Sequence, residues 1–561
     1  MGFDLKITGG TILDGSGKPG YRGDVGIRDG KVVALGNAEG EARESIDATG
    51  RAVSPGFVDI HTHYDAQIVW DRMLSISPWH GVTTVVMGNC GFGVAPTKPA
   101  HRNMIMRTLE KVEGMSLGAL QAGLGADWPF ESFPQYLDAI ETGGMAINVG
   151  VLARHTPIRT YVMGEDAVKR AATGDEIAAM ARIVREAMDA GAIGFATSGA
   201  ATHNGYDGNP VPSRMAEFDE VDALVGAMKR SGRGTLQATV GRKMFHAEFE
   251  RLARKHGVPV TWTALLSGMA GPGSHRKHIE ATHRYFEKEG LNIIPQVACR
   301  PINFDFDFAE PFPFEMRPVF KPTMTMDRKA KRAIYADAAF RAAFKDDTKP
   351  GAPTPLSGWA ERAVISVAPG HESWEERPLA QVAQEQGCAP IDLALDMSVD
   401  SDFKARFRFG VLNTDEAEVA ELLQDPYIVV ALSDAGAHAS QLCDACYATH
   451  FLGYWVRERK LFSLEQAVHM LTERAAQVFG IKDRGRLAVG LPADVVVFDP
   501  ATIAAGKIKR VWDLPSGADR LVAPASGIDA VVVNGCIVRR HDRDAVNGGR
   551  MPGRLLRAGE G

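Results

Sequence analysis

Short apolar runs alternate with amphipathic segments through the middle of the chain. In the segment 174–191, "GDEIAAMARIVREAMDAG", apolar residues recur every three or four positions, which is the spacing of a helix with one buried face. Apolar runs of strand length lie between such segments, and eight of them cover residues 57–63, 82–90, 147–155, 192–198, 235–240, 258–265, 291–300 and 427–438. Eight strand units separated by helices predict an α/β fold of the (β/α)8 TIM barrel type, in which chemistry gathers where the strands end.

The two ends of the chain have a different, strand-rich pattern. Residues 1–55 contain β-patterned runs punctuated by Asp-Gly, and residues 485–561 repeat this style, with the Asn-Gly pair at 534–535 as a hairpin signal. We expect these terminal strands to pair into one small sheet domain beside a barrel at 56–484. The connection at about 301–426, after the seventh strand, is too long for a loop and predicts a lid or subdomain over the site.

Composition and charge argue against two classes of partner. Of the 561 residues, 45% are hydrophobic and 24% are charged, and the formal net charge is -6. This balance lacks the basic excess of a nucleic-acid-binding protein, and no apolar run reaches the roughly 18 residues of a membrane-spanning helix. The N-terminal residues do not resemble a secretory leader, and six scattered cysteines do not form a disulfide framework. We therefore expect a cytoplasmic protein with reduced thiols.

A pair of histidines at the end of the first predicted strand is the candidate metal site. In "FVDIHTHYD", His61 and His63 are two positions apart, so both side chains face the same side of the strand, into the barrel. Neutral imidazole is a common ligand of zinc, although two histidines at this spacing can also be incidental. Cys90 ends the second run and Asp434 lies in the eighth, where a lone cysteine often only packs and an aspartate often only forms a turn. Their joint appearance at strand ends favours a metal site.

Other polar residues at predicted strand ends are weaker candidates for contacts with a substrate, because Arg and His in such places also pair structurally with carboxylates. These candidates are His155, Arg159, His203, Arg242, Arg300 and His438. Cys443 and Cys446 have the spacing of zinc ligands, but no second such pair follows, and a structural role fits them better.

Motifs along nearly the whole chain carry a family resemblance. They are, in order, "GGTILDGSG", "SPGFVDIHTHYDAQ", "GVTTVVMGNCGFGVAP", "RTYVMG", "SDAGAH" and "DRGRLAVGLPADVVVFDP". Together they resemble the amidohydrolase superfamily, and the Gly-Asn-Cys-Gly element resembles its D-aminoacylase branch, where the cysteine binds metal. The resemblance implies a metal-dependent hydrolase of amide bonds other than peptide bonds, with a β-sandwich built from both chain ends. It also implies a metal site of His61, His63, Cys90 and Asp434, with Asp434 transferring the proton.

The sequence departs from this family where the fifth and sixth strands end. Val240 and Ala264 occupy positions where the family has histidine ligands, and Leu266 stands where a lysine would hold the substrate carboxylate. We therefore predict one metal ion rather than two, with zinc favoured over other divalent transition metals. We also predict a small-molecule substrate that is larger and less charged than a simple N-acetyl-D-amino acid.

Two other functions remain open from the sequence. A cyclic amide or lactone hydrolase, or a lyase, can use the same metal-binding barrel, because a fold does not determine a function. A catalytically silent binding protein would explain the missing histidines, but retention of the four polar residues argues against it, since buried polar groups without a role are costly. The sequence is also compatible with an oligomer.

Overall fold

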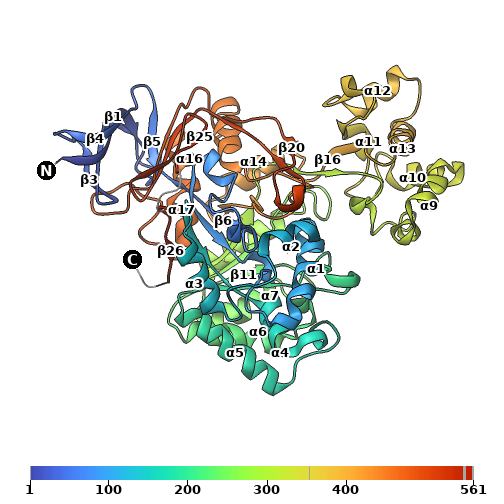
Figure 1. The fold of residues 1–561 in the computed structure, drawn as a ribbon, viewed down its shortest axis with the longest axis horizontal. Helices are drawn as coiled ribbons and strands as arrows, with labels where there is room; N and C mark the ends of the chain where they lie inside the picture. Colours follow the sequence, from blue (N-terminus) through green and yellow to red (C-terminus); the bar gives the residue numbers. More distant parts are fainter. Residues whose placement is uncertain (1, 353, 547–550, 559–561) are drawn as a thin grey trace.

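Parallel strands form the centre of the computed structural model, which describes residues 2–352, 354–546 and 551–558 (Figure 1). Each of the eight runs predicted as a barrel strand contains a strand: β6 (Phe57–Thr62), β7 (Val82–Met87), β8 (Asn148–Val151) with its continuation β9 (Ala153–Arg154), β10 (Gly194–Ser198), β11 (Thr235–Thr239), β12 (Val260–Thr263), β13 (Ile293–Val297) and β17 (Val429–Val430). Each pairs in parallel with the next. A parallel bridge between Thr62 and Ala435 joins the last strand to the first. This is the strand order of a (β/α)8 barrel.

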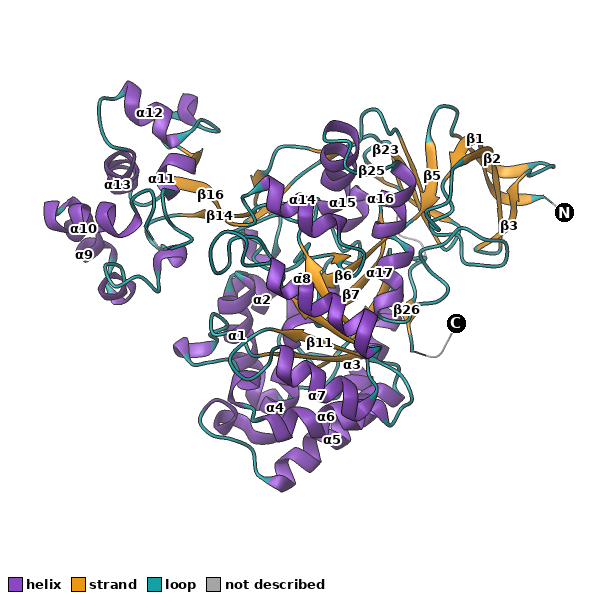
Figure 2. Ribbon diagram, turned by 180° about the vertical axis from the view of Figure 1, so that it is seen from behind, coloured by secondary structure: helices purple, strands orange, loops and turns teal. Residues whose placement is uncertain are grey.

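Helices cover the outside of the barrel strands (Figure 2). They are α1 (Arg102–Glu113), α2 (Leu117–Leu124), α3 (Phe133–Gly143), α4 (His155–Met163), α5 (Gly174–Asp189), α6 (Phe218–Lys229), α7 (His246–His256), α8 (Arg276–His283), α14 (Glu416–Gln424), α15 (Tyr447–His450), α16 (Leu464–Leu471) and α17 (Glu473–Val478). In α5, a capping box of Thr173 and Glu176 begins the helix, and Met180, Val184 and Met188 form its buried face. Burying such a side chain stabilises the fold by about 1.5–3 kcal/mol. No helix of the described residues is long and apolar enough to span a membrane.

A nine-stranded sheet combines strands from both ends of the chain. Its members are β1 (Phe3–Ile12), β2 (Tyr21–Arg28), β3 (Lys31–Gly36), β4 (Ala42–Asp47), β5 (Ala52–Pro55), β18 (Val495–Phe498), β23 (Ile528–Val533), β24 (Cys536–Arg540) and β25 (Arg543–Asp544). Antiparallel pairing of β5 with β18 joins the two chain ends. Asn534 and Gly535 connect β23 to β24 with φ angles of +44° and +79°, the left-handed pair that a two-residue type I′ hairpin turn requires.

Part of the C-terminal region lies against the barrel instead of in this sheet. β26 (Leu555–Leu556) pairs in parallel with β8. Two small antiparallel pairs come earlier, β19 (Ala504–Ala505) with β22 (Ala525–Ser526) and β20 (Lys509–Val511) with β21 (Arg520–Val522). Leu521 N, in β21, donates a hydrogen bond of 2.7 Å to Ala439 O, just beyond the end of the last barrel strand. The C-terminal region therefore reaches the barrel mouth.

The long connection between β13 and β17 forms a lobe that extends to one side of the barrel (Figure 1). Its sheet has the order β14-β16-β15, with β14 (Ile302–Phe306), β15 (Val364–Val367) and β16 (Arg406–Leu412), and its helices are α9 (Arg328–Ala336), α10 (Ala338–Thr348), α11 (Trp359–Arg362), α12 (Leu379–Glu385) and α13 (Pro390–Asp400). Phe306, Phe314 and Trp359 are fully buried in an aromatic core that is separate from the barrel core. The Phe-rich stretch of the sequence thus builds a subdomain with its own core.

Asp305 anchors the base of this lobe. Its Oδ1 lies 2.6 Å from Arg406 Nε on β16 and 2.7 Å from Arg510 Nη2 on β20. Its backbone N donates a hydrogen bond of 2.7 Å to Gln441 O, in the segment that follows β17. One buried residue therefore connects the lobe and the C-terminal region through its carboxylate, and the barrel mouth through its backbone N.

Candidate metal centre

His61 and His63 lie side by side at the carboxyl end of β6. The side chains alternate along the strand, so both rings face the barrel interior, with centroids 5.3 Å apart. Both residues are buried, with 1% and 7% of their surface exposed. His61 Nδ1 lies 2.6 Å from Gln296 Oε1, and Gln296 Nε2 donates to Thr261 Oγ1, which orients the amide. His61 Nδ1 is therefore the donor, and its Nε2 is left as a free ligand atom.

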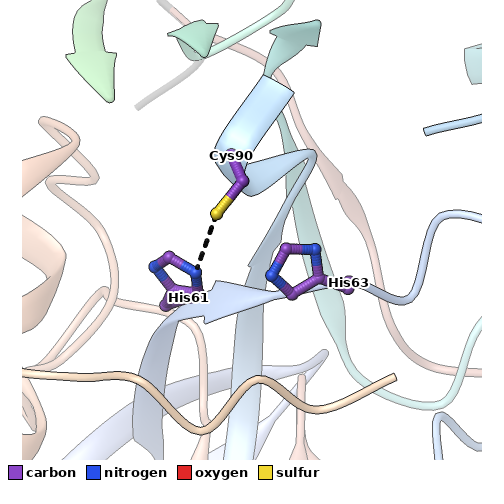
Figure 3. Close-up of side chains that lie close together, drawn as sticks. All are labelled: His61, His63 and Cys90. Atoms are coloured by element: carbon purple, nitrogen blue, oxygen red, sulfur yellow. Dashed lines mark hydrogen bonds between the residues drawn. The ribbon is translucent and has the colours of Figure 1, made fainter. Parts of the chain in front are cut away.

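Cys90 lies in a tight turn (η3, Asn89–Gly91) directly after β7. Its φ angle of +55° is unusual for a residue other than glycine, and a hydrogen bond of 2.7 Å from Cys90 N to Gln237 Oε1 holds it there. Cys90 Sγ lies 3.7 Å from His61 Nε2. One ligand atom from each of His61, His63 and Cys90 falls within 4.8 Å of the others (Figure 3).

Asp434 approaches the same place from the end of β17. Its Oδ1 lies 3.2 Å from His61 Nε2 and 3.8 Å from His63 Nε2. Ser433 Oγ donates a hydrogen bond of 3.1 Å to His61 O, which fixes the loop against β6. The structure thus brings all four predicted metal-site residues to one cavity of about 140 Å³. Two imidazoles, a thiol and a carboxylate are a donor set that fits zinc better than magnesium or calcium.

The buried donors change the acidity of one another. Burial opposes a charge on Cys90, but the imidazoles of His61 and His63 outweigh it and lower the pKa of the thiol to about 7. Burial would lower the pKa of His61, yet Cys90 and Asp434 raise it overall. The thiolate, which is the form that binds metal, is therefore accessible near neutral pH.

The cavity has further polar walls. His203 and His438, both predicted as candidates for substrate contacts, line it, as does Glu113 from the end of α1. His203 Nδ1 lies 2.7 Å from Ser198 Oγ, and burial lowers the pKa of this histidine to about 3, so its ring is neutral. Glu113 was not a candidate from the sequence, because it ends the amphipathic helix "RNMIMRTLEKVE", where a charged residue usually faces solvent.

The other four candidates for substrate contacts lie outside this cavity. His155 and Arg159 are fully buried, and their side chains contact Glu220 Oε1 at 2.8 Å and 2.9 Å. They lie there because β9 leads directly into α4, which turns both side chains toward the first turn of α6. Arg242 is exposed and lines a separate cavity beside β10. Arg300 does not line the cavity.

Arg300 belongs to a buried cluster with the Cys-x-x-Cys pair. Its Nη1 donates to Cys443 O at 3.1 Å and contacts Cys446 Sγ, and it lies 3.5 Å from Asp444 Oδ1. Cys443 and Cys446 are both buried. These contacts agree with a structural role for the pair.

The ends of β11 and β12 present no imidazole to the cavity. The described residues that line it from these two strand ends are Thr239, Thr263 and Ala264. Val240 packs against the main core, and Leu266 is buried in a neighbouring apolar cluster. The three positions where the resemblance predicts histidine or lysine therefore carry hydrocarbon side chains, and the neighbouring Thr239 and Thr263 present hydroxyl groups to the cavity.

Comparison with known proteins identifies the family. A family described as "Amidohydrolase family" matches residues 44–539. An N-acyl-D-glutamate deacylase of Alcaligenes xylosoxydans xylosoxydans is 31% identical, covering 99% of this chain and 96% of that protein, and a D-aminoacylase of the same organism is 29% identical, covering 96% and 94%. The chain therefore belongs to the amidohydrolase family, and it is a metal-dependent hydrolase.

Solved structures agree with this assignment. An N-acyl-D-glutamate deacylase from Bordetella bronchiseptica, in complex with zinc and a phosphonate mimic of the tetrahedral intermediate, has a TM-score of 0.68 and 27% identity, with all of both chains covered. A D-aminoacylase whose binuclear centre is described as activated by one metal and attenuated by a second has a TM-score of 0.67 and 25% identity, covering 99% of this chain and 100% of that one.

In metal-free protein, alkylation of Cys90 by iodoacetamide should have its midpoint near pH 7, because the thiolate is the reactive form and exists above the pKa of about 7. Cys388 is an internal control, since it is exposed and desolvation raises the pKa of its thiol. Peptide mass spectrometry over a pH series gives both curves from one sample. A Cys90 midpoint at or above that of Cys388 would contradict the pairing of the thiol with the two imidazoles.

Proposed function

We propose that this enzyme hydrolyses the amide bond of small N-acylated amino-acid derivatives with one zinc ion held by His61, His63, Cys90 and Asp434. The observation that carries the proposal is the buried convergence of two imidazoles and a thiol within 4.8 Å at the barrel mouth. The deacylase activities named for the relatives and the zinc in one related structure support the reaction class.

Asp434 is the residue that would move the proton. A bound zinc ion would supply a water of pKa near 7 and polarise the substrate carbonyl. Asp434 is about a quarter exposed (24%) and borders the cavity, so its carboxylate can accept a proton from the attacking water and pass it to the leaving nitrogen. Gln296 and Gln237 fix the His61 ring and the Cys90 backbone, which keeps the ligand atoms in place.

The donor set predicts about one tightly bound zinc ion per chain. A second ion would need ligands from β11 and β12, where the described lining residues are Thr239, Thr263 and Ala264. Elemental analysis of protein purified without chelator measures the stoichiometry, and it should fall in Cys90→Ala but not in the control Cys388→Ala. Two tightly held equivalents would overturn the single-ion site, and His203 would be the first additional ligand to examine.

His61→Ala and Asp434→Asn should both abolish most hydrolysis, for different reasons. Loss of the imidazole should lower the zinc content, whereas the asparagine keeps the shape and removes the base, at a cost of about 10²–10⁴ in kcat. Zinc content and kcat, measured on the same preparations, separate the two effects, and exposed His371 serves as the control in His371→Ala. An Asp434→Asn enzyme that keeps most of its activity would exclude Asp434 as the proton carrier.

Substrates that depend on a free carboxylate should be poor. The described residues lining the cavity include no Lys or Arg, so nothing there compensates the desolvation of a carboxylate with a permanent positive charge. We expect kcat/KM for N-acetyl-D-methionine to be below about 10⁴ M⁻¹s⁻¹. N-acetyl-D-methioninamide differs only in having an amide in place of the carboxylate, and we expect its kcat/KM to be at least as high. A clear preference for the acid at or above this value would show that another residue anchors it.

The packing of the chain supports three units. We assign residues 1–55 and 485–561 to one β-sandwich and residues 56–484 to the catalytic barrel, with the insertion at about 301–426. Separate apolar cores support this division. Leu5 and Val495 belong to the core of the terminal sheet, and Phe306 belongs to the core of the lobe.

The chemistry of the thiols supports a cytoplasmic location. All six cysteines are free, as expected in a reducing compartment. The partner that the cavity fits is a small-molecule substrate, as it is for the relative solved with a phosphonate inhibitor.

A further inference from the structure

In each of the two site histidines, the ring nitrogen Nδ1, which faces away from the other candidate ligands, lies next to a different side chain. Nε2 of His61 faces Cys90 and Asp434, and its Nδ1 meets the amide oxygen of Gln296 at 2.6 Å. Nε2 of His63 also faces Asp434, and its Nδ1 lies 3.1 Å from Glu113 Oε1. Nδ1 of each ring therefore lies beside an acceptor oxygen, the amide oxygen of Gln296 in a hydrogen bond for His61 and the carboxylate of Glu113 in an ion-pair contact for His63.

Glu113 is an unusual carboxylate for the end of a surface helix. Its side chain is only 8% exposed, and it borders the cavity. Among the described residues, its ion-pair contact is with His63, and no Lys or Arg reaches it. Burying a carboxylate whose ion-pair partner is a histidine of the site, and not a Lys or Arg, is costly, so a role at the site explains its position better than a role in helix packing.

The end of α1 is fixed in place beside the site. Gly114 ends the helix in the left-handed conformation (φ +57°), and its carbonyl accepts a hydrogen bond of 3.1 Å from Ser440 Oγ. A side chain at this glycine would begin 3.2 Å from His438 Cα. The segment that follows Asp434 thus holds Glu113 at a fixed distance from His63.

We infer that Glu113 is a positioning residue for the metal ligand His63. Its Oε1 lies 3.1 Å from Nδ1, which makes no hydrogen bond among the described residues, so the carboxylate is placed to attract Nδ1–H and favour the neutral tautomer that presents Nε2 to the metal, the arrangement of a carboxylate–histidine–metal triad. The inference rests on the proposed metal site. The two carboxylates would then have different roles, because Asp434 lies next to Nε2 of His63, the atom proposed to bind metal, and Glu113 lies next to Nδ1 on the opposite side of the ring.

The variants Glu113→Ala and Glu113→Gln test this role, with Glu141→Gln at an exposed ion pair of α3 as the matched control. Zinc affinity, measured by competition with a chromophoric chelator, should fall about 10–100-fold in Glu113→Ala. It should fall less in Glu113→Gln, whose amide oxygen can still accept the hydrogen bond, as Gln296 does for His61. Glu141→Gln should bind zinc like the unmodified protein.

Nitrogen-15 NMR of the histidine rings in metal-free protein gives a second readout that does not depend on zinc or activity. At a pH where the ring is neutral, His63 should carry its proton on Nδ1 in the unmodified protein and show a mixture of tautomers in Glu113→Ala. Unchanged affinity and an unchanged ring signal in a folded Glu113→Ala would overturn the role. If the unmodified protein bound no zinc, the proposed metal site would be wrong. The ring signal would still show whether Glu113 determines which nitrogen of His63 carries the proton.

Discussion

Closure of the barrel between its first and last strands is the constraint on which the candidate site depends. The bridge from Thr62 to Ala435 and the hydrogen bond from His63 N to Ala435 O fall at the level of the ligand atoms. Because β6 and β17 run in parallel, their carboxyl ends meet, and Asp434 must lie opposite His61. Cys90 and Glu113 then come from the connection that follows β7. The same backbone contact that completes the barrel therefore assembles a site from residues far apart in sequence.

Much of the fold and the centre of the site could be predicted because both follow from strand periodicity. Each of the eight apolar runs contains a strand, and the two-residue spacing of His61 and His63 places both rings in the barrel. Cys90 and Asp434 could be placed only as strand-end residues. Their shared left-handed backbone, which brings the side chains inward, follows from tertiary contacts that no local pattern shows.

The remaining side chains could not be assigned, because their roles depend on which helix packs beside them. His155 looks like a strand-end ligand, but Glu220 from α6 binds it in the protein interior. Glu113 looks like a solvated helix end, but the path of α1 turns it into the cavity. At β11, Thr239 and not Val240 borders the cavity. A shift of one residue exchanges the two faces of a strand, and only the three-dimensional pairing determines which face is inside.

The lobe has a consequence for how the protein unfolds. Its aromatic core is separate from that of the barrel, and the strands β14 and β16 connect it to the rest of the chain around Asp305. Cooperativity requires shared buried contacts, and two cores joined by a narrow ribbon share few of them. We therefore expect the lobe and the barrel to unfold in separate transitions, each with its own free energy of unfolding. A ligand that binds at the barrel mouth would raise the free energy of unfolding of the barrel. It would stabilise the lobe only through the buried ion pairs at the base of the lobe.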